Sequence, residues 1–175
     1  MERGNMEKAR PYIEQALALG AVDAVPIAVS DIHFDSRTLL KCLYSCPYGP
    51  RYTCPTAPGS PTMEQYREMI SRYSWGVLVH GHERGQALDI AFELERRAFV
   101  DGYHLAWSLS GCPGCAAGCA LKEGKPCRFV KRARPQLYSV GVDVFATVHG
   151  LGLPLHTLTD PEREEQNWYG LTLME

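Results

Sequence analysis

The sequence lacks any long apolar run: no segment of its 175 residues approaches the roughly 20 apolar residues that a membrane-spanning helix needs. Its first ten residues are polar and of mixed charge, without the apolar stretch of a signal peptide. We therefore expect a cytoplasmic protein with no membrane partner. In that reducing compartment stable disulfides are rare.

An excess of charge of one sign is missing as well. Eighteen Lys and Arg side chains stand against twenty Asp and Glu, which gives a formal charge of −2. A general nucleic-acid-binding protein usually carries a basic excess, so we expect no nucleic-acid partner. The chain also has no Gly-rich phosphate loop, no Ser/His/Asp arrangement and no HExxH zinc motif. These absences leave open whether the protein is an enzyme.

Cysteine, in contrast, is plentiful and unevenly placed. All seven cysteines fall in two short stretches, spaced C-x3-C-x7-C and C-x2-C-x3-C-x7-C. They are Cys42, Cys46 and Cys54 in the first stretch, and Cys112, Cys115, Cys119 and Cys127 in the second. An odd number argues further against a disulfide framework. Thiolates are soft metal ligands, and close spacing lets a loop enclose one metal centre at low entropic cost. We expect both stretches to bind metal.

The spacing also bears on the kind of metal. Three thiols close in sequence and one more distant, as in the second stretch, match the ligation of a [4Fe–4S] cluster. Proline follows Cys46, Cys54 and Cys112, as it follows a ligating cysteine in ferredoxin-type sequences. Structural zinc usually takes two short paired hooks, whereas this chain has a single C-x2-C. The cofactor we expect is one or two [4Fe–4S] clusters, with zinc as the alternative.

The first stretch offers only three thiols. A [4Fe–4S] cluster held there would have one iron without a cysteine ligand, and an open metal position is what distinguishes a reactive site from a structural one. Alternatively, another side chain fills that position. The candidates are His33, Asp35, His80 and His82.

Several other side chains near the cysteines are open to more than one interpretation. Basic residues surround Cys127, and they offset the charge of a thiolate-ligated cluster, dock an acidic partner, or are simply solvated. They are Lys122, Lys125, Arg128, Lys131, Arg132 and Arg134. Asp143 caps a helix, bonds a cluster ligand or faces water. Tyrosines around the first stretch are expected to shield a cluster from solvent: Tyr44, Tyr48 and Tyr52.

Apolar patterning predicts strands that alternate with helices. Strands are expected over residues 21–34, 75–80, 103–109 and 168–174, and helices over 11–19, from Thr62, over 84–100 and over 135–148. This alternation predicts a single α/β domain, residues 1–175, with a mixed or mostly parallel sheet, flanking helices and two cysteine-rich metal-binding loops. If the strands that precede the loops are parallel, both loops lie at one carboxyl edge of the sheet.

A set of motifs in this order resembles a known family. They are Cys42-x3-Cys46-Pro-Tyr-Gly, Cys54-Pro, Cys127-Arg, Arg134-Pro135 and Gly141-Val-Asp-Val-Phe145. They are similar to small bacterial and archaeal proteins labelled as predicted metal-binding, with a domain of unknown function. The resemblance, which runs from about Leu40 to Phe145, implies a cysteine-bound metal, a [4Fe–4S] cluster, in organisms that are often anaerobes, and it brings no established reaction. The chain departs from the family pattern in having C-x2-C-x3-C for C-x2-C-x2-C, and Gln136-Leu-Tyr138 where Ser-Met-Glu is expected.

Three functions are consistent with this sequence. In the first, the protein carries clusters and transfers electrons to a protein redox partner, which docks on the basic loop. In the second, it is an enzyme that binds substrate at the open iron of the three-cysteine cluster. In the third, zinc is structural and the domain is an interaction module. We favour electron transfer, because nothing outside the cysteines resembles an acid–base apparatus. The sequence does not indicate an oligomeric state.

Overall fold

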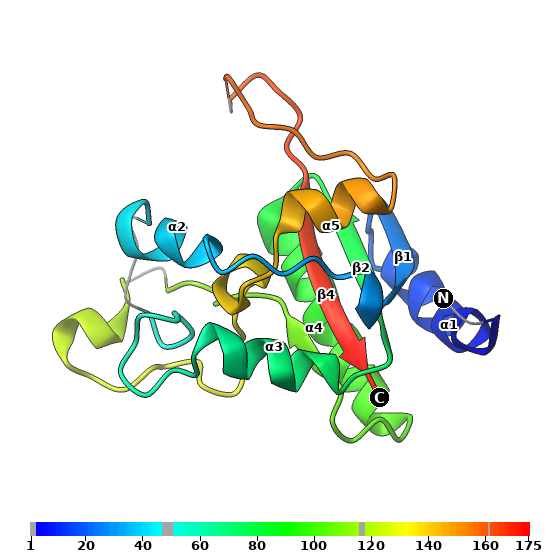
Figure 1. Ribbon diagram of the computed structural model, residues 1–175, viewed down its shortest axis with the longest axis horizontal. Coiled ribbons are helices and arrows are strands. Elements are labelled where there is room, and N and C mark those ends of the chain that lie inside the picture. Colours follow the sequence, from blue (N-terminus) through cyan, green and yellow to red (C-terminus); the bar gives the residue numbers. More distant parts are fainter. Residues whose placement is uncertain (1–2, 47–50, 116–117, 161) are drawn as a thin grey trace.

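The computed structural model describes residues 3–46, 51–115, 118–160 and 162–175. Within these residues the strands form one four-stranded sheet in the order β1-β2-β4-β3 (Figure 1). The strands are β1 (Asp23–Ala28), β2 (Trp75–Gly81), β3 (Trp107–Leu109) and β4 (Trp168–Met174). The α-helices are α1 (Arg3–Ala18), α2 (Thr38–Tyr44), α3 (Met63–Ser71), α4 (Arg84–Val100) and α5 (Val144–Gly150). Three short 3-10 turns are η1 (Val29–Asp31), η2 (Ala120–Glu123) and η3 (Leu137–Val140).

Every neighbouring pair of strands in this sheet is antiparallel, so the expectation of a mixed or mostly parallel sheet is wrong. The last residue of β1, Ala28, pairs with the first residue of β2, Trp75. The chain leaves β1, crosses the face of the sheet to α2, and returns through α3 to the end of the sheet that it left (Figure 1). Alternation of strands and helices predicts the α/β class, but it does not fix strand direction.

The sheet separates two apolar clusters, since successive side chains of a strand point to opposite faces. On one face α1 and α4 pack against Trp75, Val77 and Val79 of β2. On the other face η1, α3, η3 and α5 pack around Leu78 of β2 and Leu171 of β4. The core of the molecule therefore lies on the sheet, and its two layers are made by segments on either side of it.

Several predicted elements are confirmed. The helix predicted over 84–100 coincides with α4, and the strand predicted over 168–174 coincides with β4. The helix predicted from Thr62 is α3, and Thr62 and Gln65 form a capping box at its start. Pro26 lies in the edge strand β1, where a missing N–H costs no ladder hydrogen bond. Phe99, next to the last residue of α4, is 59% exposed.

Other predicted elements are shorter than expected. The helix predicted over 135–148 is divided into η3 and α5, because Gly141 adopts a left-handed φ of 91° between them. The side chain of Asp143 then caps α5 by accepting a hydrogen bond from the backbone N–H of Ala146 at 3.0 Å. The strand predicted over 103–109 is limited to β3. Among the described residues, no helix has the length and apolar character needed to cross a membrane.

Candidate metal centre

All seven cysteines lie in one part of the molecule, which we call the cysteine lobe and define as residues 38–61 and 111–134. It contains α2 and η2 and extends from the sheet on the side away from α1 (Figure 1). Cys54 and Cys127, the last cysteines of the two stretches, lie in irregular structure, as the prolines and glycines around them predict. Each of the seven thiols is free and half-buried.

The cysteine lobe has almost no apolar core of its own. Among its described residues the buried apolar side chains are Ala120 and Ala133 alone, whereas the sheet buries Trp75, Leu78 and Leu171. Helix α2 has no buried residue, although Leu40, Leu43 and Tyr44 lie along it. Burial of apolar surface is the main force that orders a domain. The order of this lobe must therefore depend on something other than apolar packing.

The second cysteine stretch forms a loop that is closed at its base by backbone hydrogen bonds. Gly111 N–H donates to the carbonyl of Pro135 at 3.1 Å, and Arg134 N–H donates to the carbonyl of Gly111 at 3.3 Å. Ser110 and Gln136 form an antiparallel bridge next to them. Gly111 has a φ of 78°, which favours glycine at this crossing. The loop between Gly111 and Arg134 thus leaves and rejoins the sheet at one point.

A buried ion pair anchors this base to helix α4. The guanidinium of Arg134 donates to the Glu95 carboxylate, with Nη2–Oε1 at 2.6 Å and Nε–Oε2 at 2.9 Å. Ser108 completes the carboxylate's bonding, since its N–H and hydroxyl both donate to Oε2, at 2.8 and 2.7 Å. The guanidinium also stacks over the ring of Trp107, 4.0 Å from its centroid. Arg134, predicted as one of the basic side chains around Cys127, is thus part of the core.

The sequence analysis missed Glu95, although a signal for it exists. Glu95 falls on the inner stripe of α4 at helical spacing from Ala91 and Ala98, both of which are fully buried. A carboxylate on such a stripe is almost never fully buried unless it is paired. Its position therefore indicates a buried cationic partner, which the structure identifies as Arg134.

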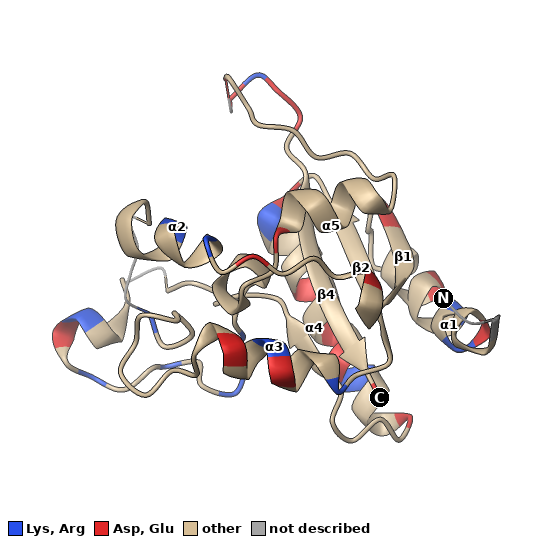
Figure 2. Ribbon diagram, viewed as in Figure 1, with Lys and Arg blue, Asp and Glu red and all other residues tan. Residues whose placement is uncertain are grey.

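The other basic residues of the loop differ in their contacts. Arg132 pairs with Asp89 of α4 at 2.6 Å, and Lys125 pairs with Glu123 at 2.8 Å. Arg128 donates to the carbonyl of Gly118 at 3.0 Å. Over the whole cysteine lobe eight Lys and Arg residues occur with one acidic residue, so most acidic residues lie elsewhere on the molecule (Figure 2). The lobe is thus basic in a protein whose total charge is slightly negative.

Two thiols of the first stretch have well-defined surroundings. Burial raises the pKa of Cys42, a hydrogen bond from the Ser139 hydroxyl lowers it, and the neighbouring thiolates of Cys54 and Cys46 raise it again. Burial also raises the pKa of Cys54. The backbone N–H of Arg51, which donates to the Cys54 Sγ at 3.1 Å, lowers that pKa. In the absence of metal both thiols therefore favour the protonated form, and a bound cation would have to displace those protons.

Charge interactions also indicate which thiols are neighbours. The thiolates that raise the pKa of Cys54 are Cys46 and Cys112, which belong to different stretches. Contacts agree with this: α2 of the first stretch packs on η3, and Ser110, two residues before Cys112, bridges to Gln136 next to η3, so the two stretches approach each other there. The reason predicted for that proximity, a common carboxyl edge of parallel strands, is wrong because the sheet is antiparallel. The stretches meet instead because the segment after β1 crosses the sheet to the side where η3 lies (Figure 1).

The thiols are near one another without forming a finished ligand set. Among the described residues no three His, Cys, Asp or Glu side chains are close enough together to hold a metal ion. The donor chemistry nevertheless fits a soft metal, since seven free thiols are gathered in a lobe rich in Lys and Arg. Such a lobe must rearrange when metal binds, which is usual where metal binding is coupled to folding.

Three of the four side chains considered as extra ligands have other partners. His80 is buried, stacks on Tyr169 with ring centroids 4.8 Å apart, and bonds Asn167 Oδ1 through Nε2 at 2.7 Å. His82 Nδ1 lies 3.1 Å from the carbonyl oxygen of Gln166. Asp35 pairs with Arg37, whose hydrogen bonds lower the carboxyl pKa to about 2. His33 is exposed, and it is its backbone N–H, not its imidazole, that donates to Thr147 Oγ1 at 3.0 Å.

The expected aromatic shield is not a uniform feature of the first stretch. Tyr44 is 82% exposed and Tyr52 is 49% exposed, so these rings face solvent, and Tyr48 lies outside the described residues. A different tyrosine lies near the thiols. Burial and the charges of Cys42, Cys46 and Cys54 raise the pKa of Tyr138.

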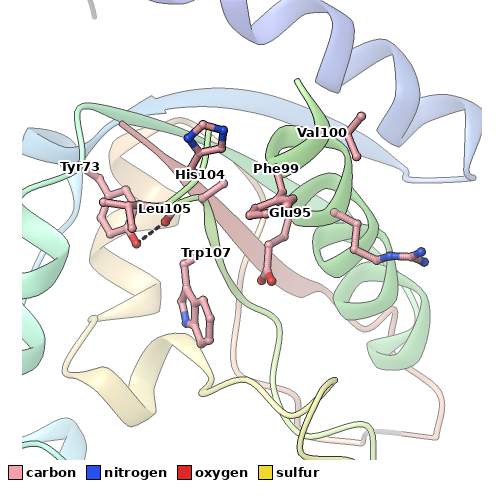
Figure 3. A pocket seen from close by; sticks show the side chains of 9 residues that line it. Tyr73, Glu95, Phe99, Val100, His104, Leu105 and Trp107 are labelled. Carbon is pink, nitrogen blue, oxygen red and sulfur yellow. Dashed lines mark hydrogen bonds between the residues drawn. The ribbon is translucent and has the colours of Figure 1, made fainter. Parts of the chain in front are cut away.

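One pocket of the described residues lies outside the cysteine lobe and contains no cysteine. It has a volume of about 560 Å³ and lies between the end of α4 and the residues before β3 (Figure 3). Phe99, Leu105 and Trp107 line it, and the hydroxyl of Tyr73 donates to the carbonyl of Leu105 at its wall at 2.7 Å. A smaller pocket of about 60 Å³ includes Cys112. We place the candidate site at the cysteines, because the larger pocket has no comparable set of reactive groups.

Comparison with known proteins supports this choice. No curated protein and no solved structure matches the chain. One family does match, over residues 25–174, and it is described as "Predicted metal-binding protein (DUF2284)". The match covers most of β1, the other three strands and the whole cysteine lobe. The chain therefore belongs to this family of cysteine-rich, predicted metal-binding proteins, whose function is unknown.

Proposed function

We propose that the seven cysteines bind two [4Fe–4S] clusters, and that the protein transfers electrons to a protein partner in the cytoplasm. The observation that carries this proposal is the cysteine lobe itself. It contains every cysteine of the chain, and its described residues bury only two apolar side chains, both alanine. A segment of this size without a core of its own needs a metal or another cross-link to be ordered.

The charge of the lobe agrees with thiolate ligation. Thiolates must be deprotonated to bind metal, so their ligation places negative charge in a half-buried site. Eight Lys and Arg residues against one acidic residue offset that charge. Lys122 and Lys131 are exposed, and they would present positive charge to an acidic redox partner.

A bound cluster would supply the electron-accepting and electron-donating centre, and the chain's own residues would set its surroundings. The Ser139 hydroxyl and the Arg51 N–H donate hydrogen bonds toward Cys42 and Cys54, and such bonds tune cluster potentials. The anchor between Arg134 and Glu95 fixes the base of the second cysteine loop to helix α4. The whole chain, residues 1–175, acts in this proposal as one domain.

Two other functions follow from the same thiols. A cluster with an open iron would make the protein an enzyme that binds a substrate heteroatom there. Structural zinc would make it an interaction module without redox chemistry. The single C-x2-C spacing favours iron–sulfur clusters over zinc. The polar groups near the thiols are hydrogen-bond donors rather than an acid–base pair, which favours electron transfer over catalysis.

The direct test is elemental analysis of protein purified without oxygen. Two clusters predict about eight irons and about eight acid-labile sulfides per chain. About four of each would reduce the proposal to a single cluster. Zinc without sulfide would overturn it, and electron transfer would then be excluded together with the open-iron enzyme.

A further inference from the structure

The cavity of about 560 Å³ at the end of α4 has the size and lining of a small-molecule site (Figure 3). Such sites usually have volumes of about 300–1,000 Å³ and walls that are mostly apolar and aromatic. Four large apolar side chains that line this cavity are exposed: Phe99 at 59%, Val100 at 81%, Leu105 at 71% and Trp107 at 41%. Exposed apolar surface that gathers in one place marks a binding site.

The walls of the cavity are held in place without a ligand. On one side the Tyr73 hydroxyl donates to the Leu105 carbonyl at 2.7 Å (Figure 3). The N–H of Leu105 donates to the side-chain carboxylate of Glu175 at 3.0 Å. On the other side Phe99 lies on the last turn of α4. Because these contacts already fix the cavity, a ligand would not spend binding energy on forming it.

The charged groups at the cavity leave little reason for a charged ligand to bind. The carboxylate of Glu95 is bonded by Arg134, and the guanidinium of Arg96 pairs with Glu93 at 3.1 Å. The carboxylate of Glu175 is exposed, so solvent and salt screen its charge. A charged ligand would have to compete with these partners or with water. An uncharged ligand would not.

The rings at the cavity indicate an aromatic ligand. They come from different parts of the chain and are Tyr73, Phe99, His104 and Trp107. Aromatic rings favour one another in offset or edge-to-face pairs, and Phe99 and His104 already form such a pair with centroids 5.9 Å apart. Among the described residues no hydrogen bond occupies the imidazole nitrogens of His104. They are therefore available to a polar group of the ligand.

The nearby edge of the sheet is closed to another occupant, a strand of a second protein. Strand β3 lies at this edge, but the N–H of Ser108 donates to the Glu95 carboxylate at 2.8 Å. Ser110, just after β3, forms a bridge with Gln136. A protein that adds a strand here would have to displace both contacts. The cavity is thus better suited to a ligand than the strand edge is.

We propose that this cavity binds a small, uncharged, planar aromatic molecule that carries one hydrogen-bonding group. The molecule lies against the ring of Trp107, which Arg134 covers at 4.0 Å, and its polar group faces His104. No thiol takes part in this site. The inference therefore goes beyond the proposed function, and its tests do not depend on which metal the cysteines bind.

The first test is a titration of the full chain with indole, an uncharged planar molecule with one N–H, followed by saturation-transfer NMR. We expect saturable binding with a Kd of about 1 mM or tighter. Phe99→Ala should weaken it at least about tenfold. Phe145→Ala is the matched control, since Phe145 is 41% exposed and meets the ring of His149 edge-on at 6.0 Å, away from the cavity. No saturable binding, or equal weakening by both variants, would overturn the proposal.

The second test concerns the polar group of the ligand. His104→Phe keeps a ring at this position and removes the imidazole nitrogens. It should weaken indole binding by about threefold to tenfold and leave unchanged the binding of indene, which has the shape of indole without the N–H. Equal weakening of both probes would overturn the assignment of a hydrogen bond to His104.

The third test concerns charge. Benzoate and benzyltrimethylammonium carry an aromatic ring with a negative or a positive charge, and both should bind more weakly than indole. Tighter binding of either one would overturn the uncharged class of ligand.

The other possible occupant of this surface is a second copy of the chain. In that case the wild type would form a dimer as its concentration rises, and Phe99→Ala would abolish the dimer. Such a result in analytical ultracentrifugation would overturn the proposal. We expect instead the same mass for the wild type and Phe99→Ala at every concentration. Because Phe99 is largely exposed, the variant should also keep the thermal unfolding midpoint of the wild type.

Discussion

At the scale of single residues, the pair of Arg134 and Glu95 links the cysteine lobe to helix α4. Both side chains are about nine-tenths buried, and Arg134 donates hydrogen bonds of 2.6 and 2.9 Å to the Glu95 carboxylate. Ser108 satisfies the rest of the carboxylate. A buried pair of this kind adds little net stability over an apolar pair, but removal of one partner leaves an uncompensated charge.

We predict that Arg134→Met lowers the free energy of unfolding by about 3–5 kcal/mol, because Glu95 is left buried without its cation. Arg132→Met is a matched control. Both arginines lie over the ring of Phe92, with centroid distances of 5.0 and 5.5 Å, but the Arg132 pair with Asp89 is exposed. The control should cost less than about 1 kcal/mol. Urea unfolding of the two variants measures the difference, and equal losses would contradict the role of the buried pair.

The sequence predicts part of this residue-scale description. The cysteines stand out through their spacing, and the family match supports metal binding. The donors that surround the thiols could not be predicted: Ser139 lies far from Cys42 in sequence and reaches it only because α2 packs on η3. Tertiary contacts bring such hydrogen-bond donors to the thiols, and local sequence patterns do not encode those contacts.

At the scale of secondary-structure elements, Gly141 determines where the helix predicted over 135–148 is broken. Its φ of 91° ends η3 and lets Val142 bridge to Phe34, so that the chain turns before α5 begins. The apolar residues Leu137, Val140 and Val148 occur at spacings that suit a helix, so the sequence pattern predicts one helix here. All three are buried in the structure. Gly141 is therefore the boundary between η3 and the segment that leads into α5.

We predict that Gly141→Ala destabilises the protein by about 1–2 kcal/mol, since an L-residue pays that amount in the left-handed region. A Cβ there would also lie 3.3 Å from Met63 Sδ. Gly85→Ala, in the first turn of α4, serves as the control because its Cβ would meet no atom within 4 Å. It should stabilise by about 0.5 kcal/mol. Thermal unfolding should therefore shift in opposite directions for the two variants, and a shared direction would contradict this explanation.

The capping box of α3 gives a further prediction at this scale. The Thr62 hydroxyl accepts from Gln65 N–H at 3.2 Å, while Thr62 N–H donates to Gln65 Oε1 at 2.8 Å. Thr62→Ala should cost about 1 kcal/mol of unfolding free energy, and Thr62→Ser, which keeps the cap, should cost far less. Guanidinium unfolding curves compare the two variants. Similar losses for alanine and serine would show that the cap does not stabilise α3.

At the scale of the whole molecule, the protein is an antiparallel sheet with two apolar layers and a cysteine lobe whose described residues bury only two alanines. The sequence predicted the α/β class, because buried strands such as β2 and amphipathic helices such as α4 have clear periods. It did not predict strand direction. Long connections, such as residues 29–74 between β1 and β2, are compatible with either direction, and the choice was made by the packing of residues 29–35 across the sheet.

The sheet buries many apolar side chains and the described residues of the cysteine lobe bury few, so we predict that the two parts differ in stability. Strands β2 and β4 are almost entirely buried, so their hydrogen bonds should open only with global unfolding. The cysteine lobe buries Ala120 and Ala133 alone among its described apolar residues, so its protection should depend on the bound metal. Removal of metal should therefore affect the lobe and spare the sheet.

The measurement that tests this central claim most directly is amide hydrogen exchange on the metal-loaded protein and on the same protein after metal removal. We predict that peptides from residues 38–61 and 111–134 lose protection when metal is removed, while those from 75–81 and 168–174 keep it. Equal protection of the lobe in both samples would contradict the claim that metal ligation by the cysteines orders this part of the molecule.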